Sequence, residues 1–127
     1  MLPAMKLFEG RTAQNLVRSY GAEGITLMAA PDVHPLPLML TATQVGIDLQ
    51  GRSLDTLTDQ DVASIEAQRP DIVLVGSAGN MPRVPAPLRH RLESRRIAIE
   101  TMELGAACRT FNVLVQEDRA VLALLLA

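Results

Sequence analysis

The sequence is poor in aromatic residues: it has no tryptophan, and two phenylalanines and one tyrosine are the only aromatics in 127 residues. A folded core must therefore consist of aliphatic side chains, which supply most of the 48% hydrophobic content. Together with 20% charged residues, this composition is typical of a globular protein and excludes a disordered one. The length predicts a single domain that covers residues 1–127.

Cysteine is also scarce, because Cys108 is the only one and cannot form an internal disulfide. A reducing compartment is the simpler expectation, and we predict a cytoplasmic protein. Residues 1–11 have no clear periodicity, which predicts a terminal arm, and they lack the features of a secretory signal. The C-terminal apolar run AVLALLLA is too short to cross a bilayer as a helix, so we predict a soluble protein without a membrane span.

Strong charge of either sign is absent, since the formal net charge is −2. This value gives no long-range attraction to nucleic acid or anionic lipid. One basic cluster is present, and it consists of Arg89, His90, Arg91, Arg95 and Arg96. Because no aromatic residue adjoins it and cations near a helix end complement the helix dipole, we interpret it as a solvated face. We therefore predict no nucleic-acid partner.

The N-terminal half predicts a β-hairpin followed by further strands. Two short runs, 16–20 and 25–29, flank the turn sequence Gly21-Ala22-Glu23-Gly24. Residues 38–41 predict a third strand, and the alternation at 45–49 predicts an extension of the same sheet. Three prolines place any strand near them at a sheet edge or a bulge: Pro31, Pro35 and Pro37.

The central part of the chain predicts a helix, a buried strand and a second helix. Thr58 is placed to cap the first helix, whose expected buried side is Val62, Ile65, Ala63 and Ala67. Residues 72–75 are wholly apolar and mostly β-branched, which is typical of a strand buried on both faces. Pro87 predicts the first turn of a helix that runs to about residue 95, with Leu88 and Leu92 pointing inward.

The C-terminal part predicts a strand at 97–101, a helix from Leu104 and a last strand at 120–127. The helix has an apolar face of Leu104, Ala107, Cys108, Phe111, Leu114 and Val115. Its other side carries Gly105, Arg109, Asn112 and Gln116. The last run is leucine-rich and compatible with a helix, but its short length favours a strand. Helices that alternate with strands predict crossover connections, a largely parallel sheet and an α/β fold.

The residues from 71 onward resemble a small family of domains of unknown function. The similarity comprises DIVLVGSAGN at 71–80, a proline-opened helix, a strand that ends at Met102, and AACRTFNVL at 106–114 followed by Glu117 and Arg119. The family includes mitochondrial NADH dehydrogenase (complex I) assembly factor three, the adipogenesis-associated domain protein and uncharacterised bacterial and archaeal proteins. The resemblance implies a three-layer domain around a central mixed sheet whose last strand runs antiparallel to its neighbours. It implies no enzymatic activity.

Two positions depart from the pattern of that family. Its members usually have Asp-Thr or Asp-Ser where this chain has Glu103-Leu104, so we expect the following helix to lack a hydroxyl cap. They also often have glycine where Asp118 stands, which concerns the turn after the helix.

Four polar residues are the candidate ligand-binding residues: Ser77, Asn80, Arg109 and Asn112. The first two follow a buried strand, at the sheet end where α/β proteins bind their ligands. Arg109 and Asn112 are three positions apart on a helix, so a guanidinium and an amide can converge on a carboxylate or phosphate. In the alternative, structural interpretation, Arg109 pairs with Glu103 or Glu117 and Asn112 holds a neighbouring loop.

No set of residues predicts catalysis or metal binding. Ser77 lies in neither a nucleophile-elbow nor a P-loop motif. Cys108 lies on the apolar face of its helix, where a buried structural thiol is commoner than a reactive one. His34 and His90 lie in different segments without a second ligand at metal-binding spacing. We therefore predict no catalytic residue, no metal and no cofactor, and favour a protein that is not an enzyme.

Two functions follow from these observations. The favoured one is a non-catalytic binding or assembly module with a protein partner, as the resemblance implies. The alternative is an enzyme or small-molecule-binding protein that holds an anionic metabolite in a crevice of the four candidate residues. A homodimer that covers apolar surface of the proline-rich hairpin region is a third possibility.

Overall fold

The computed structural model describes residues 14–46, 49 and 53–127, which form two sheets and their covering helices. The strands are β1 (Val17–Gly21), β2 (Gly24–Leu27), β3 (Ala30–His34), β4 (Leu38–Thr41), β5 (Ile72–Ser77), β6 (Ala98–Glu103) and β7 (Val121–Leu126). The helices are the 3-10 turn η1 (Leu54–Thr56), α2 (Asp59–Ala67), α3 (Ala86–Glu93) and α4 (Leu104–Gln116). No helix of the described residues is long and apolar enough to cross a bilayer.

The larger sheet has the strand order β4-β7-β5-β6 and confirms the predicted mixed, mostly parallel α/β architecture. Strand β5 runs parallel to both β6 and β7, and β4 runs antiparallel to β7. The last strand, β7, was expected to run antiparallel to its neighbours. This expectation is wrong for its pairing with β5, which is parallel. Helix α4 carries the chain from the end of β6 back to the start of β7, and such a crossover makes the strands parallel.

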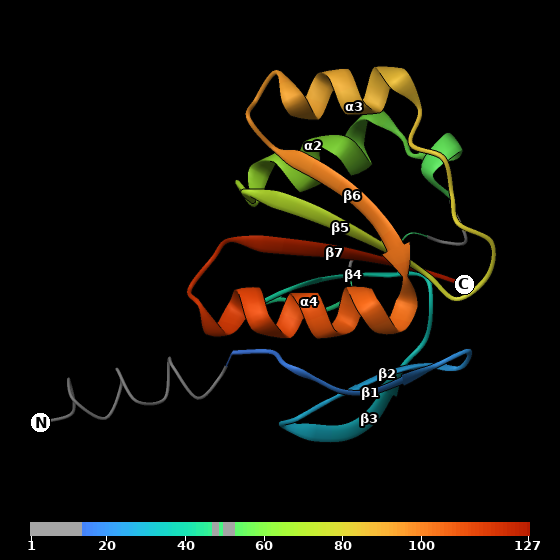
Figure 1. Ribbon diagram of the computed structural model, residues 1–127, viewed down its shortest axis with the longest axis vertical. Helices are drawn as coiled ribbons and strands as arrows, with labels where there is room; N and C mark the ends of the chain where they lie inside the picture. Colours follow the sequence, from blue (N-terminus) through green and yellow to red (C-terminus); the bar gives the residue numbers. More distant parts are fainter. Residues whose placement is uncertain (1–13, 47–48, 50–52) are drawn as a thin grey trace, which may run out of the picture.

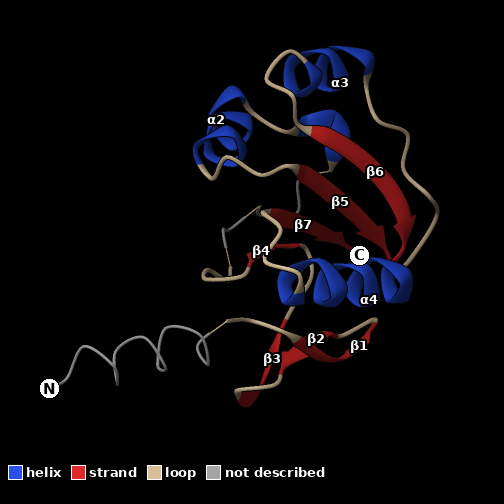
Figure 2. Ribbon diagram, turned by 60° about the vertical axis from the view of Figure 1, so that its left-hand side comes forward, coloured by secondary structure: helices blue, strands red, loops and turns tan. Residues whose placement is uncertain are grey.

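The layers are α2 and α3, then the four-stranded sheet, then α4, and finally the small sheet of β1, β2 and β3 (Figures 1 and 2). Side chains alternate between the two faces of the larger sheet. Val73 and Val75 pack with α2 and α3, whereas Leu74 packs with α4. Every residue of β7 is buried, which confirms the strand prediction for the C-terminal run. An aliphatic core on each face thus holds the three central layers together.

Helices α2 and α3 lie over one face of the larger sheet. Thr58 caps α2 reciprocally with Asp61, since each side chain accepts a hydrogen bond from the backbone N–H of the other. Val62 and Ile65 are buried, but the expected burial of Ala63 and Ala67 is wrong because both are exposed. The helix has only nine residues, so one narrow side reaches the sheet. In α3, Leu88 and Leu92 are buried as predicted.

The small sheet has the order β1-β2-β3 and contains the predicted hairpin. The turn is shorter than expected because Gly21 pairs with Gly24, which leaves two residues between the strands. Strand β3 was not predicted, because it contains Pro31; as an edge strand it tolerates proline. Strand β4 pairs with β7 and not with the hairpin. At the expected strand 45–49, the structure shows only an isolated bridge between Leu40 and Val45 among the described residues. Residues 47 and 48 lie outside the described residues, and so does the predicted terminal arm at 1–11.

In the described part of the chain, each of the three α-helices ends close to a residue in the left-handed backbone conformation, and none of these residues is glycine. The φ angles are 50° at Arg69, 60° at Arg96 and 59° at Asp118. After α4, the backbone N–H of Asp118 donates to the carbonyl of Val115, and that of Arg119 donates to the carbonyl of Leu114. This pair of hydrogen bonds is characteristic of a Schellman turn. The frequent glycine of the resembling family at position 118 fits this conformation, which glycine adopts without strain.

Candidate functional site

Ser77 is the last residue of β5 and Asn80 lies in the loop that follows, and the Ser77 hydroxyl is hydrogen-bonded within the protein. Ser77 is buried, and its Oγ donates to the backbone carbonyl of Asn80 at 2.9 Å and accepts from the N–H of Gly79 at 3.2 Å. Strand alternation places Ser77 on the same side of the sheet as Val73 and Val75, toward α2 and α3. Asn80 is exposed. The serine therefore stabilises its own turn.

The adjoining start of α4 is closed by packing and by a carboxylate cap. A Cβ atom at Gly76 would lie 2.6 Å from the Cβ of Ala107, so the helix rests directly on β5. Glu103 accepts from the N–H of Gly105 at 2.6 Å and of Ala106 at 3.2 Å. These bonds lower the pKa of Glu103. A hydroxyl cap is absent as expected, and the longer carboxylate side chain takes its role.

Arg109 and Asn112 both hold the first strand against α4. The Asn112 side chain accepts from the N–H of Val17 at 2.8 Å and donates to its carbonyl at 2.9 Å. Nη1 of Arg109 donates to the Tyr20 hydroxyl at 2.7 Å. The structural interpretation thus identified the role of Asn112 but not its partner. Among the described residues, no ion pair joins Arg109 to Glu103 or Glu117, because the guanidinium turns toward β1 instead.

The structure thus joins the four candidates in two separate groups. Hydrogen bonds link Ser77 to Asn80, and others link Arg109 and Asn112 to β1. Three of the four side chains already have partners within the protein. A ligand role for this set stays a prediction.

Cys108 is a protonated structural thiol at neutral pH. It is 2% exposed on the face of α4 that packs on the sheet. Burial raises its pKa to about 11, with the Glu103 carboxylate adding to the rise and Arg109 opposing it. A thiol needs its thiolate form to act as a nucleophile or metal ligand. Among the described residues, no three His, Cys, Asp or Glu side chains cluster as metal ligands would.

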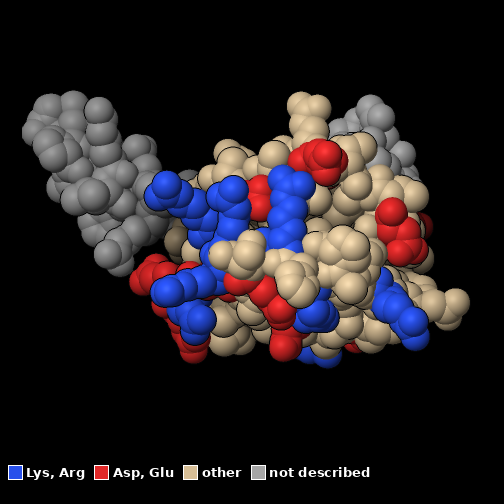
Figure 3. All heavy atoms as spheres, turned by 90° about the horizontal axis from the view of Figure 1, so that it is seen from above, with Lys and Arg blue, Asp and Glu red and all other residues tan. Residues whose placement is uncertain are grey.

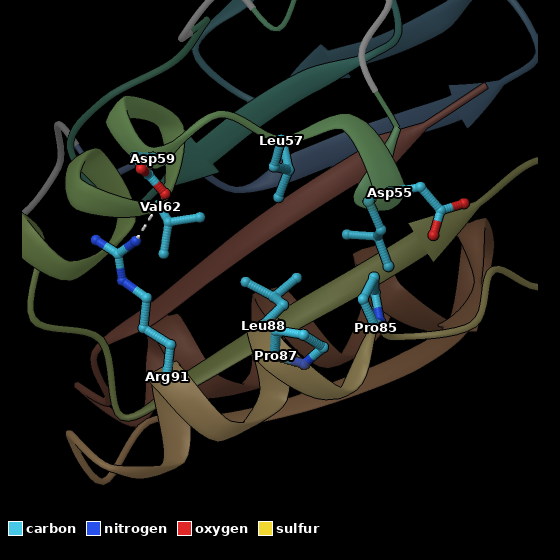
Figure 4. A pocket seen from close by; sticks show the side chains of 9 residues that line it. Asp55, Leu57, Asp59, Val62, Pro85, Pro87, Leu88 and Arg91 are labelled. Atoms are coloured by element: carbon cyan, nitrogen blue, oxygen red, sulfur yellow. Dashed lines mark hydrogen bonds and ion pairs between the residues drawn. The ribbon is translucent and has the colours of Figure 1, made fainter.

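A groove that sequence reasoning missed lies between α2 with the preceding η1 and the start of α3 (Figure 4). Its volume is about 280 Å³, and its lining includes Leu54, Leu57, Val62, Pro85, Pro87 and Leu88, with Asp55, Asp59 and Arg91 as the charged members. Figure 4 shows Arg91 and Asp59 together at one end and Asp55 at the other. The sequence hid this groove because its walls are about thirty positions apart and η1 carries no periodic signal.

The charged end of this groove has one firm contact and one loose contact. Arg91 donates from Nε and Nη2 to the two carboxylate oxygens of Glu66, at 3.1 and 3.0 Å. This bidentate contact lowers the pKa of Glu66. Nη1 of Arg91 lies 3.4 Å from Asp59, whose side chain is fully exposed to solvent. The Asp59 contact is thus the replaceable one.

Comparisons with known proteins agree with this architecture. A family described as protein of unknown function (DUF498/DUF598) matches residues 17–126. The chain is 29% identical over 87 residues to the 13 kDa major membrane protein of Francisella tularensis subsp. holarctica, which covers 67% of this chain and 70% of that protein. None of these descriptions states a biochemical activity.

Solved structures show the same fold. An outer membrane protein from Bartonella henselae is 35% identical, with a TM-score of 0.72 over 91% of this chain and 96% of that one. An Mth938-like domain from Bordetella pertussis is 22% identical, with a TM-score of 0.67 over 91% and 87% of the two chains, and this similarity supports the fold alone.

Proposed function

Because this chain belongs to the DUF498/DUF598 family of proteins of unknown function, we propose that it is a non-catalytic binding module for a protein partner. The observation that carries the proposal is the apolar groove of Figure 4, with its loosely paired Asp59 at one end. Partner proteins often insert an apolar side chain into such a pocket and pair a charge beside it.

The polar groups support a module without catalysis. The Ser77 hydroxyl, the Asn112 amide and the Glu103 carboxylate all hold backbone groups of the protein itself. Cys108 is buried and protonated. A nucleophile, a base and an orienting group within reach of one another are the minimum for most hydrolytic chemistry. Among the described residues, Ser77, Asn112 and Glu103 make hydrogen bonds that stabilise the fold.

The groove specifies the chemistry of its partner. Leu57, Val62 and Leu88 offer an apolar wall, so burial of one leucine-sized side chain contributes roughly 1.5–3 kcal/mol to binding. A partner carboxylate replaces Asp59 at Nη1 of Arg91, while Glu66 keeps the guanidinium oriented. We therefore expect a partner segment with an apolar side chain next to an acidic one.

The setting of this interaction is part of the proposal. Relatives named as a membrane protein and an outer membrane protein support a partner that resides in a membrane. The resemblance to complex I assembly factors supports a role in building a membrane complex. We place the protein at the cytoplasmic surface, as the single buried cysteine favours a reducing compartment.

A groove variant with a matched control tests the proposal. Pro87→Glu places a carboxylate over the apolar wall, in the first turn of α3 where the helix dipole favours it. Gln60→Glu adds the same charge to the first turn of α2 and lies outside the groove. Each full-length variant is purified from its own cells by affinity capture and compared with the wild type by mass spectrometry. We expect one protein to copurify with the wild type and with Gln60→Glu, and to be lost with Pro87→Glu.

Equal recovery of every copurifying protein with Pro87→Glu and Gln60→Glu would contradict the proposal. Turnover of a metabolite by the purified wild type would contradict its non-catalytic part. The anionic-metabolite alternative has less support, because Ser77, Arg109 and Asn112 are already bonded within the protein. Loss of an anion-induced thermal shift in Arg109→Ala would support that alternative.

A homodimer through the small sheet is also compatible with the structure. Met28 is 59% exposed and Val33 is 54% exposed, and both lie in the proline-rich hairpin region. Sedimentation of the wild type and of Val33→Lys measures this association directly. A monomer at all concentrations would eliminate the homodimer.

A further inference from the structure

A second groove lies at the end of the larger sheet where β5 and β6 begin, away from Ser77 and the start of α4. It has a volume of about 490 Å³ and is lined by Glu66, Arg69, Pro70, Asp71, Arg95, Arg96 and Ile97. Arg69 follows α2, and Arg95 and Arg96 follow α3. Figure 3 shows Lys and Arg side chains gathered toward this end of the molecule. The fold thus brings together arginines that are 26 positions apart in the sequence.

Positive charge exceeds negative charge in this groove. Glu66 is shared between Arg91 at 3.0 Å and Arg95 at 3.1 Å, so one carboxylate faces two guanidinium groups. Asp71 lies 3.9 Å from Arg119, which is outside the groove lining. Within the described part of the chain, neither Arg69 nor Arg96 forms an ion pair. These two side chains keep their donors available to solvent.

The backbone conformation of Arg69 and Arg96 adds to this argument. Both residues have a left-handed backbone, with φ of 50° and 60°, in which glycine is more stable than arginine. The negative end of the helix dipole favours a cation near each helix end. A cation within the last helical turn satisfies the dipole without this strain, so the dipole alone does not explain arginine at these two positions.

We propose that this groove binds a phosphate group through Arg69 and Arg96, with Arg95 as a third donor. The guanidinium group presents parallel N–H donors that match the oxygens of a phosphate. The lining contains no aromatic side chain on which a base could stack, so the phosphate is the recognised part. The phosphate belongs to a free phosphorylated metabolite or to a phospholipid head group, and the experiment separates these two sources.

The test uses glycine substitutions that remove the side chains and suit the backbone. Arg69→Gly/Arg96→Gly deletes both guanidinium groups at positions where glycine relieves strain, so the variant retains its fold. The control Arg18→Ala/Arg83→Ala removes the same charge from exposed residues outside the groove. Circular dichroism and denaturation confirm that both full-length variants are folded.

Two probes distinguish the sources. Titration calorimetry measures the Kd for inorganic pyrophosphate, and flotation measures binding to vesicles of phosphatidylglycerol and phosphatidylcholine, with pure phosphatidylcholine as the neutral reference. We expect the glycine variant to bind at least one probe about tenfold or more weakly, and the control to match the wild type. Pyrophosphate binding identifies a free phosphate compound, and binding to anionic vesicles alone identifies a lipid head group.

Failure of the wild type to bind either probe would overturn the proposal. An equal loss of binding in the two double variants would overturn it as well, because that result indicates attraction by net charge alone. The Pro87→Glu experiment concerns another groove and another partner, so each proposal can fail while the other stands.

Discussion

The two ends of the four-stranded sheet use their polar side chains differently. At the carboxyl end and along the adjoining α4, Ser77, Glu103 and Asn112 are bonded to backbone groups of the protein. At the opposite end, Arg69 and Arg96 stand in strained conformations without an ion pair to any described residue. The comparison teaches that polar residues at the customary ligand-binding end of an α/β sheet can serve the fold, while available charge collects elsewhere.

The largest expected effect comes from Asn112→Ala, which tests whether α4 uses its polar side chains structurally. The change leaves the N–H and carbonyl of buried Val17 without their partners, so we expect a loss of about 2–3 kcal/mol in the free energy of unfolding. Urea denaturation measures it. Asn80→Ala is the matched control, since only the backbone of Asn80 accepts the bond from Ser77. Similar values for the two variants would remove the contrast between these asparagines.

Gly76→Ala tests whether packing closes the carboxyl end of the sheet. The new methyl group would lie 2.6 Å from the Cβ of Ala107 and 3.0 Å from a methyl carbon of Leu125. Because Ala107 is fixed on its helix, we expect a loss of about 1–3 kcal/mol in the free energy of unfolding. At Gly79 the nearest atom to an added Cβ is 3.7 Å away, so Gly79→Ala should leave stability nearly unchanged. A stable Gly76→Ala would mean that α4 does not rest on this strand.

Glu103→Gln tests the carboxylate cap of α4 through its pH dependence. Backbone N–H donors lower the pKa of Glu103, so the ionised form stabilises the folded state above the ordinary value of 4.5. This contribution is lost as the pH falls through the lower, folded-state pKa. Wild type and variant should therefore differ most in thermal midpoint above pH 4.5 and converge below it. A difference that is constant with pH would contradict the role of the charge, and Glu117→Gln, past the other end of the helix, is the control.

The smallest effect is expected for Asp118→Gly, which probes the left-handed residue between α4 and β7. Glycine adopts the φ of 59° without a Cβ clash, so stability should rise by roughly 0.5–1 kcal/mol. Glu117→Gly removes the same charge from the preceding residue, whose φ is −90°, and should give no gain. Equal effects would show that charge, and not backbone conformation, governs this turn.

Local sequence signals predicted most of the larger sheet and its helices. Leu104 begins α4 as its apolar spacing indicated, Thr58 caps α2, and the leucine-rich C-terminal run is a strand. These features depend on neighbours a few positions away, which one sequence contains. Strand β3 was missed because Pro31 is a strong negative signal that an edge position cancels. Its pairing partner is β2, the strand that directly precedes it.

The candidate site was harder to predict because its contacts span most of the chain. Asn112 and Val17 are 95 positions apart, and no local pattern reveals that an amide on α4 clamps a strand backbone. For the same reason, the sequence did not reveal that Arg69 shares a groove with Arg95 and Arg96, although the two later residues were recognised as part of a basic cluster. The sequence shows which polar side chains are present, whereas only the fold shows which of them have partners within the protein.

The clamp between Asn112 and Val17 also has a consequence for biosynthesis. At a translation rate of about 5–20 residues per second, the ribosome finishes β1 roughly 5–20 s before the amide that secures it is made. Strand β4 likewise awaits β7, its partner in the sheet. Strands β1 and β4 therefore emerge with unpaired edges and gain these partners only when α4 and β7 leave the exit tunnel.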